Sequence, residues 1–439
     1  MVKRLRGNPS VARALNQTTV FDLLRTGRVI SRVGLARETG LGKATISEII
    51  EQFIAEGFVR VIGTGESRGG RRPVLLEFDP RARLAIGVEL GDTTCSAVLT
   101  DLNAQPIRSL TTSVRALSAE EAIDAAASLV SELRSAVQGY SLIGLGVGTP
   151  GLVDSERGVI RMAPDLGWQE VPVGPRLADG FNLPVAVVNR AKAAALGEAW
   201  CGAGRQVDNL VYVSVSTGIA AGIVLDGRLY RGTSMSEGEL GHVTVAPNGP
   251  LCRCGNRGCL QSLAGSEAIL SRVREQIRDG QPTTLAANAE SSLDLLTLQI
   301  VAEAAAANDP LALGVIEEVA LHIGIAVAGL VNILNPRMLI FGGSVVRLLP
   351  TIVPAIEAEV RRRAMAVPAA ALTVAPSQLG REAVPIGAAA YVLSQIPVVG
   401  SPHLRPMASN VIQPRYGPLP PTTVGHHTST GEASPEVRR

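Results

Sequence analysis

Apolar residues near the start of the chain recur at the spacing of an α-helix. Two short apolar faces, at 20–24 and 35–36, precede a longer one with spacings of i, i+3, i+4, i+7 and i+8. The longer face consists of Ile46, Ile49, Ile50, Phe53 and Ile54. The segment 38–42 between the second and third helices contains Gly40, which supplies the left-handed residue that a tight turn needs. This pattern predicts a helix-turn-helix.

Two strands are predicted after these helices, at 58–62 and 74–78, and a basic, glycine-rich loop joins them. The segment 1–82 is therefore predicted to be a winged helix-turn-helix that binds double-stranded DNA, with its third helix in the major groove. The candidate contacts at the start of that helix are Lys43, Ala44, Thr45, Ser47 and Glu48. In the wing loop, Arg68, Arg71 and Arg72 suit phosphates or a narrow minor groove. The alternatives are ordinary solvated helix positions and a mobile loop.

From residue 83 onwards, predicted strands alternate with predicted helices, which indicates an α/β architecture. The strands are expected at 84–94, 95–101, 143–148, 185–188, 211–215 and 338–341, with a hairpin at Asp226-Gly227. Helices are expected at 118–138, 191–200 and 383–393, and the stretch 263–330 is expected to be mostly helical. Residues 397–439 are rich in Pro, Ser, Thr and His without periodicity, which predicts a disordered tail.

Four potential metal ligands lie within eighteen residues of one another in the segment 237–262. They are His242, Cys252, Cys254 and Cys259. A Cys₃His set fills all four positions of tetrahedral Zn²⁺ and leaves none for a reactive water, so the predicted site is structural. Gly255, Asn256 and Gly258 are expected to supply the positive-φ turns of this zinc knuckle. The alternative is three reduced thiols and a core histidine that merely share a loop.

Length, charge and cysteine content limit the classes of protein that fit. A chain of 439 residues suggests two or three domains. Residues 1–83 hold 15 Lys/Arg against 8 Asp/Glu, whereas the whole chain has a net charge of +2, so the basic end is expected to meet a polyanion. There is no signal peptide pattern and no charge-free apolar run of about 18 residues, which predicts a cytoplasmic protein with no membrane span. Cys95 and Cys201 are interpreted as buried thiols.

Over residues 16–395 the chain resembles the ROK family, named for repressors, open reading frames and sugar kinases. The most specific marks are GELGHVTVAPNGPLCRCGNRGCL, STGIAAGIVLDGRLYRG and SRGGRRPVLLEFDP. The resemblance implies a two-lobed, actin-like ATPase fold of the sugar kinase type, and it supports the zinc assignment. The expected divisions are a first lobe at 83–188, a second lobe with the zinc knuckle at 189–380 and a closing helix at 381–396. The attached DNA-binding module places the chain with the family's transcriptional regulators, which are expected to be homo-oligomers, either dimers or tetramers.

The segments that resemble the kinase motifs differ from them at the catalytic positions. The DxGGT-type phosphate loop of the family is Glu89-Leu90-Gly91-Asp92-Thr93 here, so Asp92 stands where a phosphate should approach. The related GTG turn is Ser216-Thr217-Gly218. The aspartate of the ENDAN-type segment, which is the general base, is replaced by Arg190, and a guanidinium cannot accept a proton at neutral pH. No catalytic residue is assigned, and the chain is predicted not to be an enzyme.

The resemblance also implies a ligand site, and this site departs from the family pattern. The implied ligand residues are Asn189, Arg190, Lys192, Glu239, His242 and Gln261. Lys192 replaces the second asparagine of the ENDAN-type segment, Gln261 replaces a glutamate, and Asp165 stands where an asparagine is common. Arg190 and Lys192 together favour an anionic effector such as a sugar phosphate or sugar acid. Alternatively, the cleft is vestigial and both cations are internal salt-bridge partners.

The sequence therefore predicts a cytoplasmic DNA-binding transcriptional regulator with a catalytically inactive, kinase-like effector body. Two other functions are consistent with the same residues. One is an active sugar kinase with an appended regulatory module, and the other is a regulator whose body is a docking surface for a protein partner.

Overall fold

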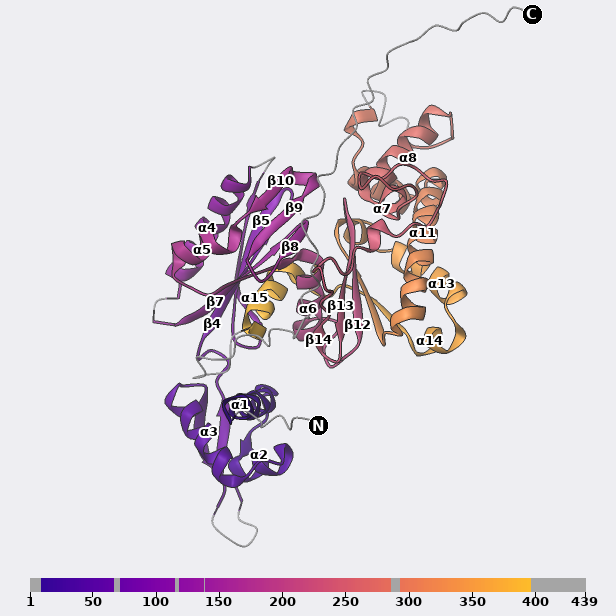
Figure 1. The fold of residues 1–439 in the computed structure, drawn as a ribbon. Helices are drawn as coiled ribbons and strands as arrows, with labels where there is room; N and C mark the ends of the chain where they lie inside the picture. The colour runs from indigo at the N-terminus through magenta and orange to yellow at the C-terminus, as the bar shows by residue number, and fades with distance from the viewer. Residues whose placement is uncertain (1–8, 67–71, 115–117, 138, 286–292, 396–439) are drawn as a thin grey trace, which may run out of the picture. The chain divides into compact units, whose positions relative to one another are not determined.

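The protein is described by a computed structural model, which covers residues 9–66, 72–114, 118–137, 139–285 and 293–395. The predicted wing contacts Arg68 and Arg71 and the predicted tail at 397–439 lie outside the described residues. The described elements form a helical N-terminal segment with a small sheet, two five-stranded sheets, one further small sheet and the helices that cover them (Figure 1).

The N-terminal segment contains the three helices and two strands that the sequence predicted, together with one short additional strand. Its elements are α1 (Pro9–Arg25), β1 (Ile30–Ser31), α2 (Arg32–Thr39), α3 (Lys43–Ala55), β2 (Val59–Thr64) and β3 (Val74–Phe78). Gly40 has φ 73° and ends α2, as predicted for the turn before α3. At the start of α2, the Gly34 N–H donates to the Ser31 hydroxyl, which satisfies a free backbone donor of the first turn.

Aromatic contacts hold this segment together. The ring of Phe21 in α1 makes edge-to-face contacts with Phe53 of α3, Phe58 and Phe78, with centroid separations of 5.9, 5.7 and 5.2 Å. The predicted apolar face of α3 is buried, including Ile46, Ile49 and Ile50. Because this face points into the core, the residues between these positions are left on the surface.

The first five-stranded sheet has the strand order β11-β7-β4-β5-β6. Its strands are β4 (Leu84–Leu90), β5 (Thr94–Thr100), β6 (Pro106–Ser113), β7 (Leu142–Thr149) and β11 (Val185–Asn189). The helices α4 (Ala119–Ser135) and α5 (Val173–Phe181) pack on it, and their apolar residues share its core. A small antiparallel sheet follows β7 and comprises β8 (Leu152–Asp154), β9 (Val159–Ala163) and β10 (Trp168–Val171), with a 3-10 turn at Pro164–Leu166.

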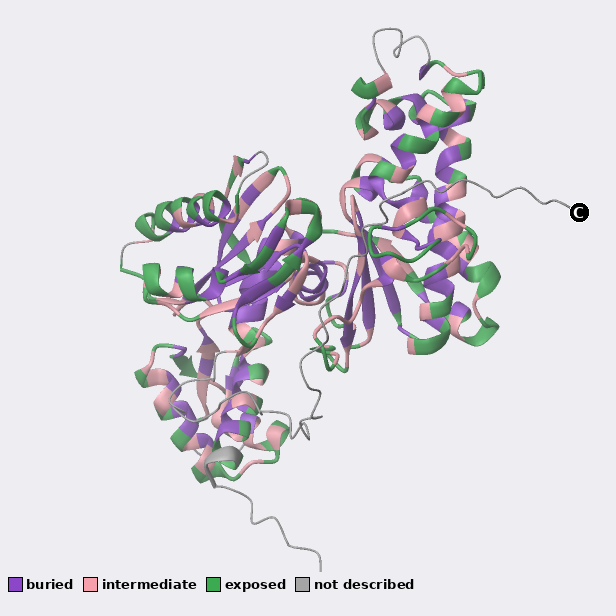
Figure 2. Cartoon of the chain, turned by 45° about the horizontal axis from the view of Figure 1, so that its top comes forward, coloured by how far each residue is buried: buried purple, intermediate pink, exposed green. Residues whose placement is uncertain are grey.

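The second five-stranded sheet has the order β14-β13-β12-β15-β16. Its strands are β12 (Leu210–Val215), β13 (Ile219–Leu225), β14 (Arg228–Leu229), β15 (Met338–Gly342) and β16 (Thr373–Pro376). The predicted Asp226-Gly227 hairpin joins β13 to β14, and both residues have positive φ. Figure 2 shows buried residues along the strands of both sheets and on the inner faces of the helices.

Of the remaining helices, α6 follows β11 of the first sheet, and the others connect or follow the strands of the second sheet. They are α6 (Arg190–Cys201), α7 (Gln261–Ala264), α8 (Ser266–Arg278), α10 (Leu298–Ala306), α11 (Pro310–Leu334), α12 (Ser344–Leu348), α13 (Ile352–Arg363), α14 (Ala366–Ala371) and α15 (Ala383–Gln395). Short 3-10 turns occur at Leu240–His242, Leu293–Leu295 and Gly380–Glu382. The α/β class is therefore as predicted, although β6, the small sheet β8-β9-β10 and β16 were not predicted. β6 is mostly exposed and polar, so it carries little of the apolar pattern that marks a strand.

Helix α11 is long and apolar enough to cross a membrane by length and composition alone. However, much of it is buried inside the protein, where Val315, Ile323 and Val327 belong to the core that also contains strands β12, β13 and β15. Two adjacent charges, Glu317 and Glu318, lie within the helix. The helix is thus accounted for as a core element of the fold.

Glycine makes very close contact possible between α15 and its neighbours. A Cβ atom on Gly387 would lie 1.7 Å from the carbonyl oxygen of Ala193 in α6. On the strand side, Cβ atoms on Gly87 and Gly146 would each lie 1.8 Å from a carbonyl oxygen of α15. These separations leave no space for any side chain, so α15 is held directly against α6, β4 and β7.

We expect Gly387→Ala to lower the free energy of unfolding by at least about 1–3 kcal/mol, because the added methyl group forces the backbones of α6 and α15 apart. Urea denaturation followed by circular dichroism measures this change. Gly329→Ala is the matched control, because Gly329 lies in helix α11 with open space around it. This control should be neutral, or stabilising by up to about 1 kcal/mol. Equal stability of the two variants would contradict the close-contact argument.

Candidate metal centre and adjoining cleft

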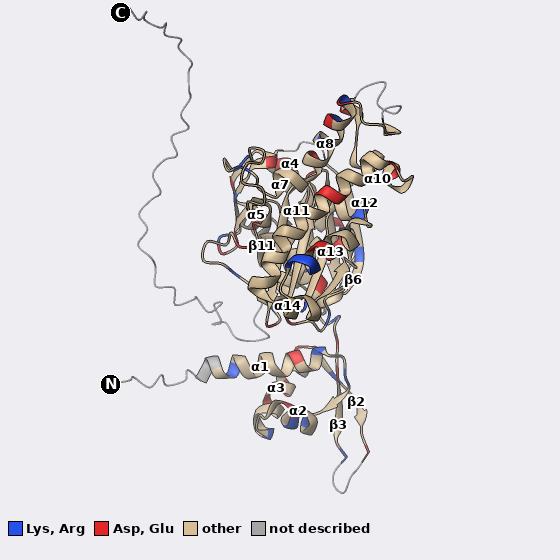
Figure 3. Cartoon of the chain, turned by 90° about the vertical axis from the view of Figure 1, so that its right-hand side faces the viewer, with Lys and Arg blue, Asp and Glu red and all other residues tan. Residues whose placement is uncertain are grey.

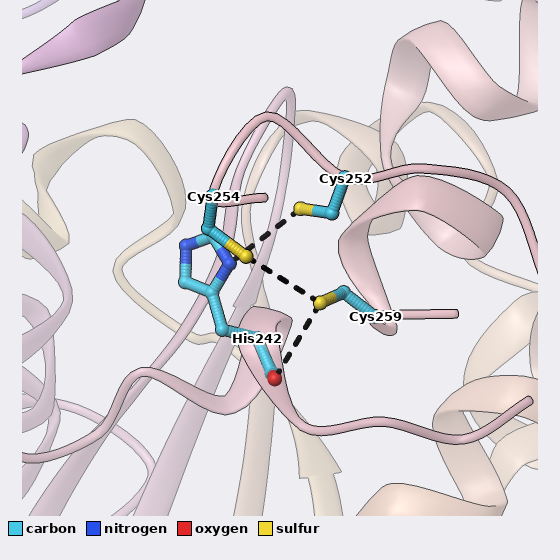
Figure 4. A group of neighbouring side chains, drawn as sticks. All are labelled: His242, Cys252, Cys254 and Cys259. Atoms are coloured by element: carbon cyan, nitrogen blue, oxygen red, sulfur yellow. Dashed lines mark hydrogen bonds between the residues drawn. The ribbon is translucent and has the colours of Figure 1, made fainter. Parts of the chain in front are cut away.

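The four predicted metal ligands converge at one point (Figure 4). One ligand atom from each of His242, Cys252, Cys254 and Cys259 lies within 4.8 Å of all the others. His242 comes from the 3-10 turn at Leu240–His242, and the three cysteines come from the loop that leads to α7. The structure therefore brings together a Cys₃His group from a single short segment.

The separations within this group match a tetrahedral metal centre. Zn–S bonds of about 2.3 Å at tetrahedral angles place two sulfur ligands about 3.8 Å apart. The sulfur atoms of Cys254 and Cys259 are 3.7 Å apart, and His242 Nδ1 is 3.7 Å from the sulfur of Cys252. The residues present thus fit a metal ion of this type in both chemistry and spacing.

Backbone conformation gives the loop its tight curvature. Gly255 has φ 90° and Gly258 has φ 65°, as predicted, and a Cβ on Gly258 would lie 1.5 Å from the carbonyl oxygen of Ala246. The prediction for Asn256 was wrong, because its φ is not positive. Asn256 stabilises the loop by hydrogen bonds instead. Its carbonyl accepts from the Cys252 N–H at 2.7 Å, and its side-chain amide donates to the Thr244 hydroxyl at 3.0 Å.

The pKa values of Cys254 and Cys259 are shifted in opposite directions. A hydrogen bond from the Asn256 backbone is the largest cause that lowers the pKa of Cys254, to about 7. Burial raises the pKa of Cys259 to about 12. A metal ligand must be a thiolate, so metal binding has to displace the proton from Cys259.

A second group of polar side chains adjoins the histidine. His242 Nε2, the ring nitrogen that faces away from the thiols, is 4.0 Å from Glu239 Oε2. Burial raises the pKa of the Glu239 carboxyl, while the nearby charges of His242 and Lys192 act in the opposite direction. Lys192 is itself nearly buried and lies 2.6 Å from Glu237 Oε1. Its ammonium also donates to the carbonyl of Met235 at 2.7 Å.

Arg190, which replaces the catalytic base of the family motif, is paired with Asp92 of the altered phosphate loop. The guanidinium Nη1 and carboxylate Oδ1 are 3.0 Å apart. Both residues line a cleft of about 390 Å³, together with Glu89, Ser216, Gly343 and Arg347. Burial raises the pKa of Glu89, and the positive charges of Arg190 and Arg347 partly oppose this shift. The cleft therefore contains one carboxylate, that of Asp92, where the kinase motif has glycine.

The other two implied ligand residues make hydrogen bonds within the protein. Asn189 caps α6, accepting from the Ala191 N–H at 2.9 Å and donating to the carbonyl of Gly151 at 2.9 Å. The side-chain carbonyl of Gln261 accepts from the Ile219 N–H at 3.4 Å. Gln261 lines a separate cavity of about 640 Å³ beside the cysteine loop. At this cavity, Asp165 is paired with Arg253 at 2.8 Å.

The six implied ligand residues therefore do not share one cavity in this structure. Glu239, His242 and Lys192 form one cluster, whereas Arg190 and Gln261 line different cavities. Sequence reasoning missed two members of the surroundings, Glu237 and Met235. A signal for Glu237 was present, because a buried lysine at position 192 requires a carboxylate nearby.

The predicted DNA-contact residues lie at the start of α3. Lys43, Ala44 and Glu48 are exposed, while Thr45 and Ser47 are partly exposed. Glu48 is paired with Arg13 of α1 at 2.9 Å, which gives it a partner within the protein. Of the three wing arginines, Arg72 is described and exposed.

The chain matches the ROK family over residues 85–395. It is 33% identical to a putative xylose repressor from Caldicellulosiruptor sp. (strain Rt8B.4) over 395 residues, which cover 89% of this chain and 98% of the relative.

Two solved structures are similar to this fold. One is a ROK family transcriptional regulator described as a homologue of the E. coli MLC protein, with 30% identity and a TM-score of 0.77. That match covers 88% of this chain and 96% of the other. The other is a ROK family glucokinase from Streptomyces griseus in complex with glucose and AMPPNP, with 29% identity and a TM-score of 0.61. It covers 70% of this chain and 98% of the glucokinase. By its sequence over most of its length and by its fold, the chain belongs to the ROK family.

Proposed function

We propose that this protein is a cytoplasmic, DNA-binding transcriptional regulator whose ROK body responds to a sugar-type effector and does not transfer phosphate. The main support is the combination of a helical N-terminal segment with a body whose base position is occupied by Arg190. The xylose repressor and the ROK regulator above match nearly the whole chain, whereas the glucokinase matches a smaller share of it.

The N-terminal segment is interpreted as a winged helix-turn-helix. Helix α3 buries its apolar face, while Lys43 and Ala44 at its first turn are exposed and free to approach a DNA groove. The segment 67–71 connects β2 and β3 in the sequence and contains two of the three wing arginines. Figure 3 shows that the helices of this segment carry both basic and acidic residues. Base contacts are assigned to the start of α3 and phosphate contacts to the wing.

The body is proposed to be inactive as a kinase. A general base must accept a proton from the sugar hydroxyl, and a guanidinium paired with Asp92 cannot do so. Asp92 also places a negative charge in the cleft where the phosphates of a nucleotide would have to lie. The glucokinase-like fold keeps the active-kinase alternative open, and a phosphoryl-transfer assay separates the two.

The Cys₃His group is proposed to hold one structural Zn²⁺. Four protein ligands at tetrahedral spacing complete the coordination shell, so the ion supplies stability to the loop and no open site for chemistry. The ion would also fix the orientation of His242 beside Glu239.

The protein is further proposed to act as a homo-oligomer, so that two α3 helices reach the two halves of one operator.

We expect purified wild-type protein to contain about one zinc ion per chain, and Cys254→Ser to lose most of it. Because a structural zinc contributes directly to folding, the variant should also melt at a lower temperature. Elemental analysis and a thermal melt measure the two effects. Cys201→Ser, which changes a thiol outside the cluster, should keep its metal. Unchanged zinc in Cys254→Ser would show that the four residues do not bind it.

Incubation with ATP and glucose, N-acetylglucosamine or N-acetylmannosamine should give no phosphorylated sugar, since loss of a general base alone costs about 10²–10⁴ in rate. A coupled assay for ADP, with a ROK glucokinase as the positive control, makes the measurement. Turnover above that of a mock preparation, abolished by Glu239→Gln, would establish the kinase alternative.

The preferred DNA, recovered by enrichment from sheared genomic DNA, should contain an inverted repeat with half-sites about 34 Å apart. Replacing Arg68, Arg71 and Arg72 together with alanine should weaken binding to all DNA sequences. It should also flatten the salt dependence of the affinity, because fewer counterions are released from the DNA. Thr45→Ala and Ser47→Ala should instead change the choice among sequences. Gel-shift titrations at several salt concentrations test both effects, with the exposed Arg157→Ala as the control. Full binding after deletion of residues 1–82 would refute the assignment of the DNA-binding module.

A further inference from the structure

The end of helix α1 contacts elements that follow the N-terminal segment in the chain. The guanidinium carbon of Arg25, the last residue of α1, lies 4.2 Å from the centre of the Trp200 ring in the last turn of α6. Arg25 Nε also donates to Asn103 Oδ1 at 3.2 Å, in the turn between β5 and β6. The Arg25 side chain is 22% exposed, so most of it is covered. This arginine of the proposed DNA-binding module therefore faces the ROK body.

The two residues that receive Arg25 are also held to each other. Cys201, the last residue of α6, donates its thiol hydrogen to the carbonyls of Asn103 and Ala104, at 3.4 and 3.3 Å. Asp101 Oδ1 accepts from the Asn103 N–H at 2.8 Å, which fixes the turn from within. The turn and the end of α6 thus form one surface whose shape does not depend on Arg25.

The connection between the N-terminal segment and the body supplies another point of attachment. Residues 79–83 join β3 to β4, and the Leu102 N–H donates to the carbonyl of Pro80 at 2.9 Å. The side chain of Leu102 is buried in the same cluster as Phe58 and Phe78. A module attached at one point can pivot about it, whereas a second point of attachment fixes its orientation. Arg25 supplies that second point.

We propose that Arg25 is a positioning residue, which fixes the DNA-binding module on the ROK body and thereby selects the half-site spacing of the operator without contacting DNA. Two modules of one oligomer gain affinity from each other only where the DNA places both half-sites within their reach. A module of fixed orientation accepts a narrow range of spacings, whereas one on a pivoting connection accepts a wider range. This inference rests on the proposed DNA-binding function and on the proposed homo-oligomer.

Tryptophan fluorescence of the full-length protein tests the contact itself. The chain has two tryptophans, so Trp168→Phe leaves Trp200 as the only one. In this background, Arg25→Ala should shift the emission of Trp200 to longer wavelength, because loss of the guanidinium exposes the ring to water. Arg13→Ala, which changes an exposed arginine of α1 paired with Glu48, should leave the emission unchanged. Equal emission from the two variants would overturn the proposal.

Gel shifts with the full-length protein measure the choice of spacing. The enriched operator is compared with versions whose half-sites are moved apart by 2 or 5 base pairs, which turns one half-site by about 70° or about 170° around the DNA axis. The wild type should bind these versions at least about 10-fold more weakly than the original operator, because the second module loses its half-site.

Arg25→Ala should reduce this discrimination between spacings at least about 3-fold, because the cation–π contact that fixes the module is lost. Its affinity for DNA with a single half-site should stay within about 2-fold of the wild type, since Arg25 is far from additive effects on base contacts. An unfolded module would lose single-site binding as well. Arg176→Ala, which changes an exposed arginine of α5 paired with Glu120, should keep the discrimination of the wild type.

Asn103→Ala alters the same contact from the body and leaves the sequence of the module intact. It should reduce the discrimination in the same direction by at least about 2-fold, because the hydrogen bond from Arg25 Nε is lost.

The outcomes separate this inference from the proposed function beneath it. If the wild type discriminates between spacings and both Arg25→Ala and Asn103→Ala do so equally well, this inference is wrong and the DNA-binding function stands. If the wild type binds all spacings alike, the inference is also wrong, while DNA binding again stands. If the wild type binds none of these DNAs, the proposed function fails and the inference fails with it.

Discussion

The tight contact of α15 with α6 is the constraint on which the body of the protein depends. Gly387 and Ala193 bring the two backbones so close that a single Cβ atom would collide with a carbonyl oxygen. On its other side α15 contacts β4 and β7 through Gly87 and Gly146, so one small-residue helix touches both the first sheet and α6. Close packing of this kind transmits displacement, because a packed interior has few voids that can absorb it. The position of the start of α6, and hence of Arg190 and Lys192, is set by this contact.

The charges that differ from the kinase motifs occur in pairs in this structure. Arg190 stands where the family has its aspartate and is matched by Asp92 in the loop that would otherwise hold phosphates. Lys192 is matched in the same way by Glu237. A single cation in either place would be left poorly solvated and unpaired, which is strongly destabilising, whereas a pair with good geometry is tolerated. Each of these two departures from the kinase pattern is thus stable only together with its partner, and the Arg190 guanidinium itself cannot act as a general base.

Sequence reasoning succeeded where the determining interactions are local and failed where they are not. The helices of the N-terminal segment follow from apolar spacing within a few turns, and the four candidate metal ligands lie within eighteen residues of one another, so their convergence needs only one loop. In contrast, Asp92 and Arg190 are 98 positions apart, and Lys192 and Met235 are 43 apart. Those contacts depend on how sheets and helices pack, which the periodicity of one segment does not encode. The error at Asn256 has the opposite origin, because a local preference for left-handed conformation was outweighed by the hydrogen bonds of the loop.

His242 links the proposed metal centre to the proposed effector site through the chemistry of its ring. Nδ1 faces the sulfur of Cys252, while Nε2 faces Glu239. A metal ion bound at Nδ1 would require a neutral imidazole, whose remaining proton would then sit on Nε2. Nε2 can only donate in that state, so it complements the carboxylate of Glu239 and leaves the acceptor capacity of the cluster to Glu237 and Glu239. If the Cys₃His group holds zinc, the cysteine loop would therefore act on the neighbouring site by fixing one tautomer of one histidine.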